Sequence, residues 1–474
     1  MRIKTLEVCD FKGFCGEHTI KFDSAAKNLV LYGENGSGKT SLFQALRLLL
    51  DSSRTPQDFA PHANIFRDAA HAGRGFVRIT LEDGSVFTWS ETAANGNTHN
   101  NVFLGDASKA KRFLDYKGLL PTYFIDGHNT QIDVFKLLVE DIFADSESTA
   151  NTPRKTFRED WQALETFKPK RYVLDTRPVR ALNAALSDFN RSLNDKLSQI
   201  RTKAQEILAL FDPDLQLDWQ FDPVSYQRKT KTFEGHVWLK PSFHGHVLSQ
   251  HQNLLNEARL SAIAVSIYFA AVLQTPPSAL RVLALDDVLI GLDMENRKPI
   301  LDILERHFTG YQIVLMTYDP VWFSIVQEHV NAERWKCVRI HRPVNVNSGV
   351  PIIEDDGYLQ TARDHLLHRG DQKSAANYAR SAFEKAMHQF CQKNSVPIRF
   401  KLLVKDLSAE DFLNAILNWQ KGKKIVIDAT LEANVRAARR ITLNPLSHAH
   451  PSPLSTRDVS DAIDVIARLE VALR

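Results

Sequence analysis

The chain has 474 residues, of which 43% are hydrophobic and 24% are charged. This composition is ordinary for a globular protein, and the length predicts two to four domains. The formal net charge of +3 is nearly neutral and neither requires nor excludes nucleic acid. No run of about 20 apolar residues and no apolar signal-peptide core occurs, so we expect a cytoplasmic protein that does not contact membranes. Its four scattered cysteines are expected to be free thiols.

The first 91 residues predict strands and one helix. Residues 3–11 and 18–22 alternate apolar and polar side chains, as half-buried strands do. Residues 28–33 form a short apolar run that is typical of a buried central strand. A glycine-rich loop follows, and then apolar residues at helical spacing over 41–51. Residues 75–91 predict a hairpin that turns at Asp83-Gly84.

The middle of the chain begins with a long helical pattern over residues 179–211. It suits an arm of a helical hairpin or short coiled coil, or else an amphipathic helix packed on its own domain. Strands are expected within 216–248, at 281–288 and at 311–319, and helices at 253–273 and 295–307. This alternation predicts a parallel sheet covered by helices, whereas the chain after about residue 365 reads as helical. We therefore expect domains at 1–150, 151–215, 216–365 and 366–474.

Residues 33–40, GENGSGKT, match the motif G-x-x-x-x-G-K-[ST] in full, between a predicted strand and a predicted helix. Glycines let such a loop curl so that backbone N–H groups point at phosphate oxygens, and the helix adds its positive end. We expect Lys39 to reach the β- and γ-phosphates and Thr40 to coordinate Mg²⁺. The expected nucleotide-binding residues are Gly33, Glu34, Asn35, Gly36, Ser37, Gly38, Lys39, Thr40 and Ser41.

A second motif begins at Arg281 and runs RVLALDDVLIGLD, in which an apolar strand ends in Asp286-Asp287. A carboxylate at such a strand tip holds Mg²⁺ directly or through water. A second carboxylate orients or deprotonates an attacking water. We assign Asp286 to the metal together with Thr40, and Asp287 to the water.

These two motifs, about 250 residues apart, resemble the split ABC ATPase heads of the SMC, RecF and RecN group. The opening residues resemble the first strand of those heads, with Phe11-Lys12 and Phe14 in the place of a Phe-[Arg/Lys]-x-Phe sequence. The resemblance implies further site residues. They are Lys12 at the nucleotide, Asn256 in a degenerate signature over 255–259, Asp293 in the D-loop, Tyr318 in place of a switch histidine, and Asp287 in place of a catalytic glutamate.

The resemblance implies an α/β fold: a split ABC-type ATPase head with a P-loop mixed sheet, a short helical or coiled-coil insertion, and an all-α C-terminal domain. It implies ATP and Mg²⁺ as cofactors, with Asp287, Lys39 and Tyr318 as catalytic residues. Two heads would sandwich ATP, which makes the protein a homodimer or a higher oligomer. The short insertion is unlike the long coiled coils of SMC proteins and argues against chromosome condensation.

More narrowly, the motifs look like compact ATPases of bacterial antiphage systems of the Septu and PARIS kind, which control a separate nuclease. The expected partner is then an effector nuclease of HNH or Toprim type, with DNA or RNA as a further partner. A RecF-like DNA-repair ATPase is one alternative. A second is an ATP-gated ribonuclease, because Arg440 and His448 resemble the paired residues of HEPN ribonucleases. The split head disfavours a transporter subunit.

Overall fold

The computed structural model describes residues 1–92, 98–110, 112–115, 132–144, 146–148, 155–166, 176–227, 230, 232–248, 254–274, 278–289, 292, 294–343, 350, 352–354, 358–398, 407–421, 425–443 and 455–473. It divides into two compact units, Met1–Ile353 and Glu354–Arg474. The division falls earlier than the boundary expected at residue 366, which lies inside helix α10 (Tyr358–Arg369).

The first unit begins with a four-stranded antiparallel sheet of order β2-β1-β4-β5. Alternate side chains of β4 are buried, so this strand has one face toward the core, whereas the last four residues of β1 are all buried. The expected strands and the hairpin at Gly84, which has φ 87°, are confirmed. The strands are β1 (Ile3–Phe11), β2 (Phe14–Lys21), β4 (Phe76–Leu81) and β5 (Val86–Ser90).

A second sheet has six strands in the order β15-β14-β3-β13-β12-β6. The four pairings from β14 to β6 are all parallel, which confirms the expected parallel sheet. Because parallel strands end at one edge, β3 and β12 bring the glycine-rich loop and the acidic pair together. The strands are β3 (Asn28–Gly33), β6 (Arg112–Asp115), β12 (Val282–Asp286), β13 (Gln312–Thr317), β14 (Trp335–Ile340) and β15 (Ile352–Glu354).

One buried side-chain amide, Gln312, joins the first sheet to the second, and another, Asn28, links two strands of the second sheet. The Gln312 side chain accepts a hydrogen bond from the Ile3 amide at 2.6 Å and donates to the Ile3 carbonyl at 2.8 Å. The Asn28 side chain accepts from the Ile313 amide at 3.0 Å. These bonds lock β1, β3 and β13 in one relative position, since leaving a buried polar group unpaired is costly.

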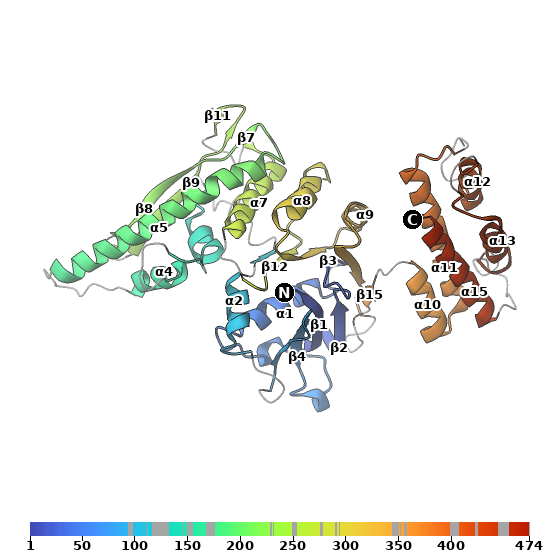
Figure 1. Ribbon diagram of the computed structural model, residues 1–474. Coiled ribbons are helices and arrows are strands. Elements are labelled where there is room, and N and C mark those ends of the chain that lie inside the picture. The colour runs from blue at the N-terminus through green and yellow to red at the C-terminus, as the bar shows by residue number, and fades with distance from the viewer. Residues whose placement is uncertain are drawn as a thin grey trace. The chain divides into compact units, whose positions relative to one another are not determined.

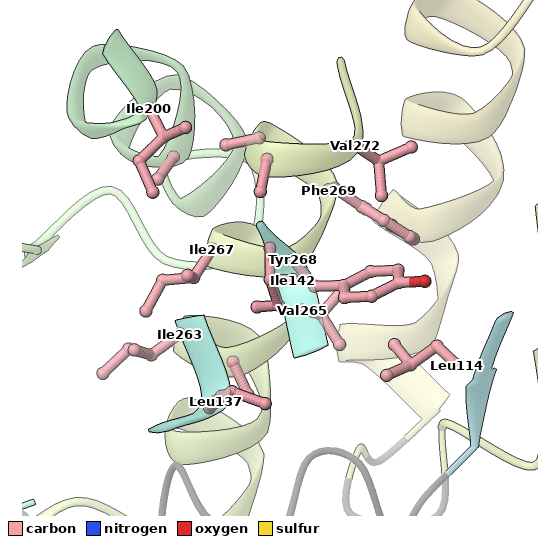
Figure 2. Close-up of a cluster of buried hydrophobic side chains, with 14 of the residues drawn as sticks. Leu114, Leu137, Ile142, Ile200, Ile263, Val265, Ile267, Tyr268, Phe269 and Val272 are labelled. Carbon is pink, nitrogen blue, oxygen red and sulfur yellow. The ribbon is translucent and has the colours of Figure 1, made fainter. Parts of the chain in front are cut away.

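Helix α7 (Glu257–Leu273) lies in the core rather than on the surface. Nearly all of its side chains are buried, because it is apolar on every face. Figure 2 shows Ile263, Ile267 and Tyr268 of this helix packed among apolar side chains from other elements, including Leu114 and Ile200. The other helices of this unit outside the insertion are α1 (Lys39–Asp51), α2 (Val102–Ala110), α8 (Met294–His307) and α9 (Pro320–His329), and 3₁₀ turns occur at Ala60–His62 and Ala69–His71.

The long helix α5 (Thr176–Leu208) confirms the helical pattern of the insertion and runs beside the β8–β9 hairpin (Figure 1). It buries one apolar face, which includes Phe189 and Ile200, in the core that also contains α7. It is thus an amphipathic helix packed on its own domain. Around it lie η5 (Leu137–Ile142), α4 (Phe157–Thr166), β7 (Leu215–Gln216), β8 (Trp219–Gln227), β9 (Thr232–Leu239), β10 (Ser242–Phe243) and β11 (His246–Val247).

The second unit is helical throughout its described residues, apart from the end of β15, and has a core of its own. Side chains of Asp371, Ser408, Asp428 and Ser455 cap four of its helices, which explains where these helices begin. Within the part of the chain that the structure describes, no helix combines the length and apolar character needed to cross a membrane. The elements after α10 are α11 (Gln372–Lys393), α12 (Ala409–Trp419), α13 (Ala429–Ala438), η7 (Arg439–Leu443) and α15 (Thr456–Ala472).

Candidate functional site

The glycine-rich loop and the acidic strand tip meet at one edge of the six-stranded sheet. β3 ends at Gly33 and β12 ends at Asp286, with β13 between them. The Thr40 hydroxyl donates a hydrogen bond of 2.8 Å to Oδ2 of Asp286, across a separation of 246 residues. The structure therefore brings together the two motifs on which the sequence interpretation depends.

Close packing around two glycines shapes the loop. Gly38 has φ 107°, and a Cβ atom placed on it would lie 3.0 Å from the Phe14 ring. A Cβ atom on Gly33 would lie 2.3 Å from Oγ of Ser37. Glycine is required at both positions because a side chain would push the loop away from its present path. Helix α1 begins directly after Gly38, so the unpaired N–H groups of its first turn face the loop.

Lys39 links the loop to the acidic pair. Its ammonium donates a hydrogen bond of 2.7 Å to the Gly33 carbonyl and lies 3.6 Å from Oδ2 of Asp287. The side chain is buried, so this charge lies where solvent screens it little. An anion in the loop would meet both the ammonium and the start of α1, a combination suited to phosphate.

The two carboxylates favour a cation beside them. The pKa of Asp286 is raised to about 6, mainly by burial and also by the charge of Asp287, while the hydrogen bond from Thr40 opposes the shift. Burial also raises the pKa of Asp287, whereas Lys39 opposes the shift. Oδ1 of Asp286 is buried and has no hydrogen-bond partner among the described residues. A free carboxylate oxygen next to a threonine hydroxyl fits Mg²⁺, which prefers oxygen ligands.

Asp287 is held by its backbone and by the neighbouring strand. Its φ of 53° is unusual for a residue other than glycine and turns the chain at the end of β12. Its amide donates to the Met316 carbonyl at 3.2 Å, and Oδ1 accepts from the Tyr318 amide at 2.9 Å. The backbone of Tyr318 therefore positions Asp287, while the Tyr318 side chain is exposed.

Other expected residues of the loop region contact its surroundings. The Lys12 ammonium donates to Oε1 of Gln44 on α1, and burial lowers the pKa of Lys12. Oγ of Ser41 accepts from the Gly13 amide at 3.3 Å. Both contacts attach the β1–β2 turn to the helix that follows the loop. The Glu34 carbonyl accepts a hydrogen bond of 3.0 Å from the Ser37 amide and closes the turn within the loop.

Asn256 lies at the start of α7, where its side chain caps the helix. Its Oδ1 accepts a hydrogen bond of 3.0 Å from the Arg259 amide. Arg259 in turn forms an ion pair of 2.7 Å with Asp212 and lies over the Phe243 ring. The contact of the Asn256 side chain in the described structure is thus to its own helix. Asp293 lies outside the described residues.

Two arginines that no motif identified are part of this region. Nε of Arg342 donates to the carbonyl of Asn35 in the loop. Arg297 on α8 pairs with Asp319, the residue after Tyr318. Neither follows a pattern that a single sequence displays, since each acts on a distant segment.

The arginines near the end of the second unit are partly neutralised. Arg436 and Arg439 both pair with Glu410, and Arg436 also contacts Glu432 at 2.9 Å. Arg440 is exposed on η7, and His448 lies outside the described residues. Of the pair Arg440 and His448 expected for a ribonuclease, the described residues therefore include only Arg440.

Comparison with known proteins gives one family match. The family model described as RecF/RecN/SMC N terminal domain matches residues 2–336. No curated protein sequence matches the chain.

Several solved structures are similar to this chain at low sequence identity. The Smc head bound to the C-winged helix domain of ScpA is 13% identical, with 75% of this chain and 98% of that chain covered and a TM-score of 0.42. The Smc head with an extended coiled coil, bound to the C-terminal domain of ScpA from Pyrococcus furiosus, is 14% identical (77% and 99% covered, TM-score 0.41). The recombination mediator RecF with ATP is 13% identical (74% and 97% covered, TM-score 0.44).

Proposed function

This chain belongs to the RecF/RecN/SMC N-terminal domain family of ABC-type ATPases, and from that premise we propose that it binds ATP with Mg²⁺ at the Thr40–Asp286 junction and hydrolyses it. The observation that carries the proposal is the 2.8 Å hydrogen bond from Thr40 to Asp286. It joins the end of a phosphate-binding loop to a buried carboxylate, which is the arrangement that a magnesium–triphosphate requires.

Each residue of the junction has a role that its contacts support. Loop amides and the start of α1 bind the phosphates, and Lys39 balances their charge. Thr40 and Asp286 offer the oxygens that hold Mg²⁺, which when bound neutralises charge on the β- and γ-phosphates. Asp287 orients the attacking water, because its Oδ1 is fixed by the Tyr318 amide while Oδ2 faces the Lys39 ammonium.

We propose that two copies of the chain form an ATP sandwich. In this arrangement the start of α7, with Asn256, acts on the nucleotide of the other copy, as the signature does in the resembled family. The side-chain NH₂ group of Asn256 keeps its donor capacity with respect to the described residues, since the oxygen caps the helix. Tyr318, exposed beside Asp287, and Asp293 would complete the same interface.

Phosphate release from ATP with Mg²⁺ tests the catalytic proposal. Lys39→Ala should abolish ATP binding and hydrolysis, because the phosphate charge would lose its buried counterion. Lys21→Ala, which removes an exposed ammonium at the end of β2, is the matched control and should keep wild-type activity. A folded wild-type protein that neither binds nor hydrolyses ATP would refute the proposed function.

We further propose that the nucleotide state controls a partner nuclease in antiphage defence. The support is the resemblance of the motifs together with a separate helical unit, Glu354–Arg474, that suits partner docking. Co-expression with an HNH or Toprim nuclease encoded beside this chain should give an ATP-dependent complex. Direct ATP-dependent DNA binding without such a complex would instead favour a repair ATPase. RNA cleavage lost in Arg440→Ala and His448→Ala would favour the ribonuclease.

A further inference from the structure

We propose that Arg297 is a positioning residue for hydrolysis, which fixes the turn that holds the Asp287 carboxylate. This inference rests on the ATPase function proposed above. Arg297 lies on the second turn of α8, and no part of it belongs to the loop or to the acidic pair. It acts through Asp319 and Tyr318.

The guanidinium of Arg297 joins two segments that flank the acidic pair. Nη1 donates to Oδ2 of Asp319 at 2.7 Å, and Nε donates to the Leu292 carbonyl at 2.7 Å. The Arg297 side chain is only 12% exposed, so both bonds are partly shielded from water. A charge-assisted bond in such a place contributes more than an exposed ion pair.

Asp319 uses the rest of its hydrogen-bonding capacity to define the turn between β13 and α9. Its Oδ1 accepts from the Val321 amide at 2.9 Å and the Trp322 amide at 3.1 Å, which caps α9. Its own amide donates to Oγ1 of Thr317 at 3.1 Å. With both carboxylate oxygens occupied, the turn over residues 317–319 has little freedom to move.

The turn over residues 317–319 also holds the carboxylate of Asp287, to which we assign the orientation of water. The Tyr318 amide donates to Oδ1 of Asp287 at 2.9 Å, which leaves Oδ2 directed toward Lys39. A small pocket beside Asp287 is lined by residues from both sides of the ion pair, among them Arg297, Leu289 and Tyr318. Losing the Arg297 bond would let the turn shift, and the Asp287 carboxylate would shift with it.

The alternative is that the ion pair only joins α8 to α9. In that case its removal would lower the melting temperature but leave the turnover of folded protein unchanged. A positioning role predicts a loss of kcat with little change in ATP affinity, because Lys39 and the loop are untouched.

The test compares Arg297→Ala, Arg297→Lys and Asp319→Asn in the full chain. We measure kcat, KM, the affinity for a fluorescent ATP analogue, and the melting temperature. Asn caps helices as well as Asp does, so Asp319→Asn weakens the ion pair while keeping α9 capped. Arg306→Ala is the control. Arg306 is exposed on the same helix, and its ion pair with Asp302 is long, at 4.0 Å, so its loss should have little effect.

We expect Arg297→Ala to lower kcat about tenfold or more and to change ATP affinity less than twofold. Arg297→Lys should recover part of the loss, since one ammonium reaches Asp319 but does not reproduce the fork to Leu292. The double variant Arg297→Ala/Asp319→Asn should have a kcat only slightly below that of Arg297→Ala, because both changes remove the same ion pair. If Arg297→Ala fails to fold, Asp319→Asn decides alone, with the same expected loss of kcat.

A wild-type kcat in a folded Arg297→Ala or Asp319→Asn protein would overturn the positioning role. With Lys39→Ala inactive in the same assay, that result would leave the proposed function intact. A wild-type protein without ATPase activity would overturn both proposals at once.

Discussion

Replacing Asp287 with Asn tests the assignment of the water-orienting carboxylate most directly. The amide has nearly the same shape, and its oxygen still accepts the hydrogen bond that the Tyr318 amide gives at 2.9 Å. The change therefore removes the negative charge and the basicity but keeps the turn. A general base typically accelerates a reaction about 10²- to 10⁴-fold. We expect kcat to fall by that factor, which corresponds to about 3–5 kcal/mol in the barrier.

ATP binding should persist in the same variant. Lys39 lies 3.6 Å from Asp287, and at an effective dielectric constant of about 20 this attraction amounts to about 5 kcal/mol before desolvation. Without the Asp287 charge, the Lys39 ammonium can interact fully with the phosphates. The affinity for ATP should therefore be unchanged or higher. The variant should then accumulate as an ATP-bound dimer.

The assay is phosphate release at saturating ATP, with binding measured by fluorescence and the dimer by size-exclusion chromatography. The control is Asp302→Asn, which changes an exposed carboxylate on α8. This variant should hydrolyse ATP at the wild-type rate. Turnover by Asp287→Asn within threefold of wild type would refute the assignment. Loss of ATP binding would show instead that Asp287 belongs to the binding site.

Two further predictions concern the shape and the pH dependence of the first unit. Gly38→Ala should weaken ATP binding about tenfold, because the φ of 107° and the Phe14 ring at 3.0 Å add about 1–3 kcal/mol of strain. The control is Gly245→Ala. Gly245 has φ 79° but no described atom within 4 Å of an added Cβ, so this change should leave ATP binding unchanged in the same titration. The His18 ring accepts a hydrogen bond from the Val350 amide at 2.8 Å, and burial lowers the pKa of His18 below 6.5. A lowered histidine pKa contributes stability that is present above pH 6.5 and is lost as the pH falls through the folded-state pKa. The melting temperature of the wild-type protein should therefore be lower at pH 5 than at pH 7.5. A His18→Gln protein with the same acid-induced loss would contradict this.

The sequence by itself determined the local elements and the identity of the key residues. Apolar periodicity predicted the strands up to residue 33, the hairpin at Gly84, the long helix and the strands at 282–286 and 312–317, because alternation and helical spacing depend only on neighbouring residues. GENGSGKT and the Asp286-Asp287 pair were also visible, since their chemistry depends on residue type and spacing within a few positions.

Only the tertiary structure decided which of these residues meet. The Thr40–Asp286 bond spans 246 residues and exists because β3 and β12 end at one edge of a parallel sheet. The Arg297–Asp319 pair, the Arg342 contact to the loop, and the capping role of Asn256 likewise depend on how segments pack, which no local period encodes. Packing also decided that α5 lies on its own domain, because its apolar face packs in the same core as the largely buried helix α7.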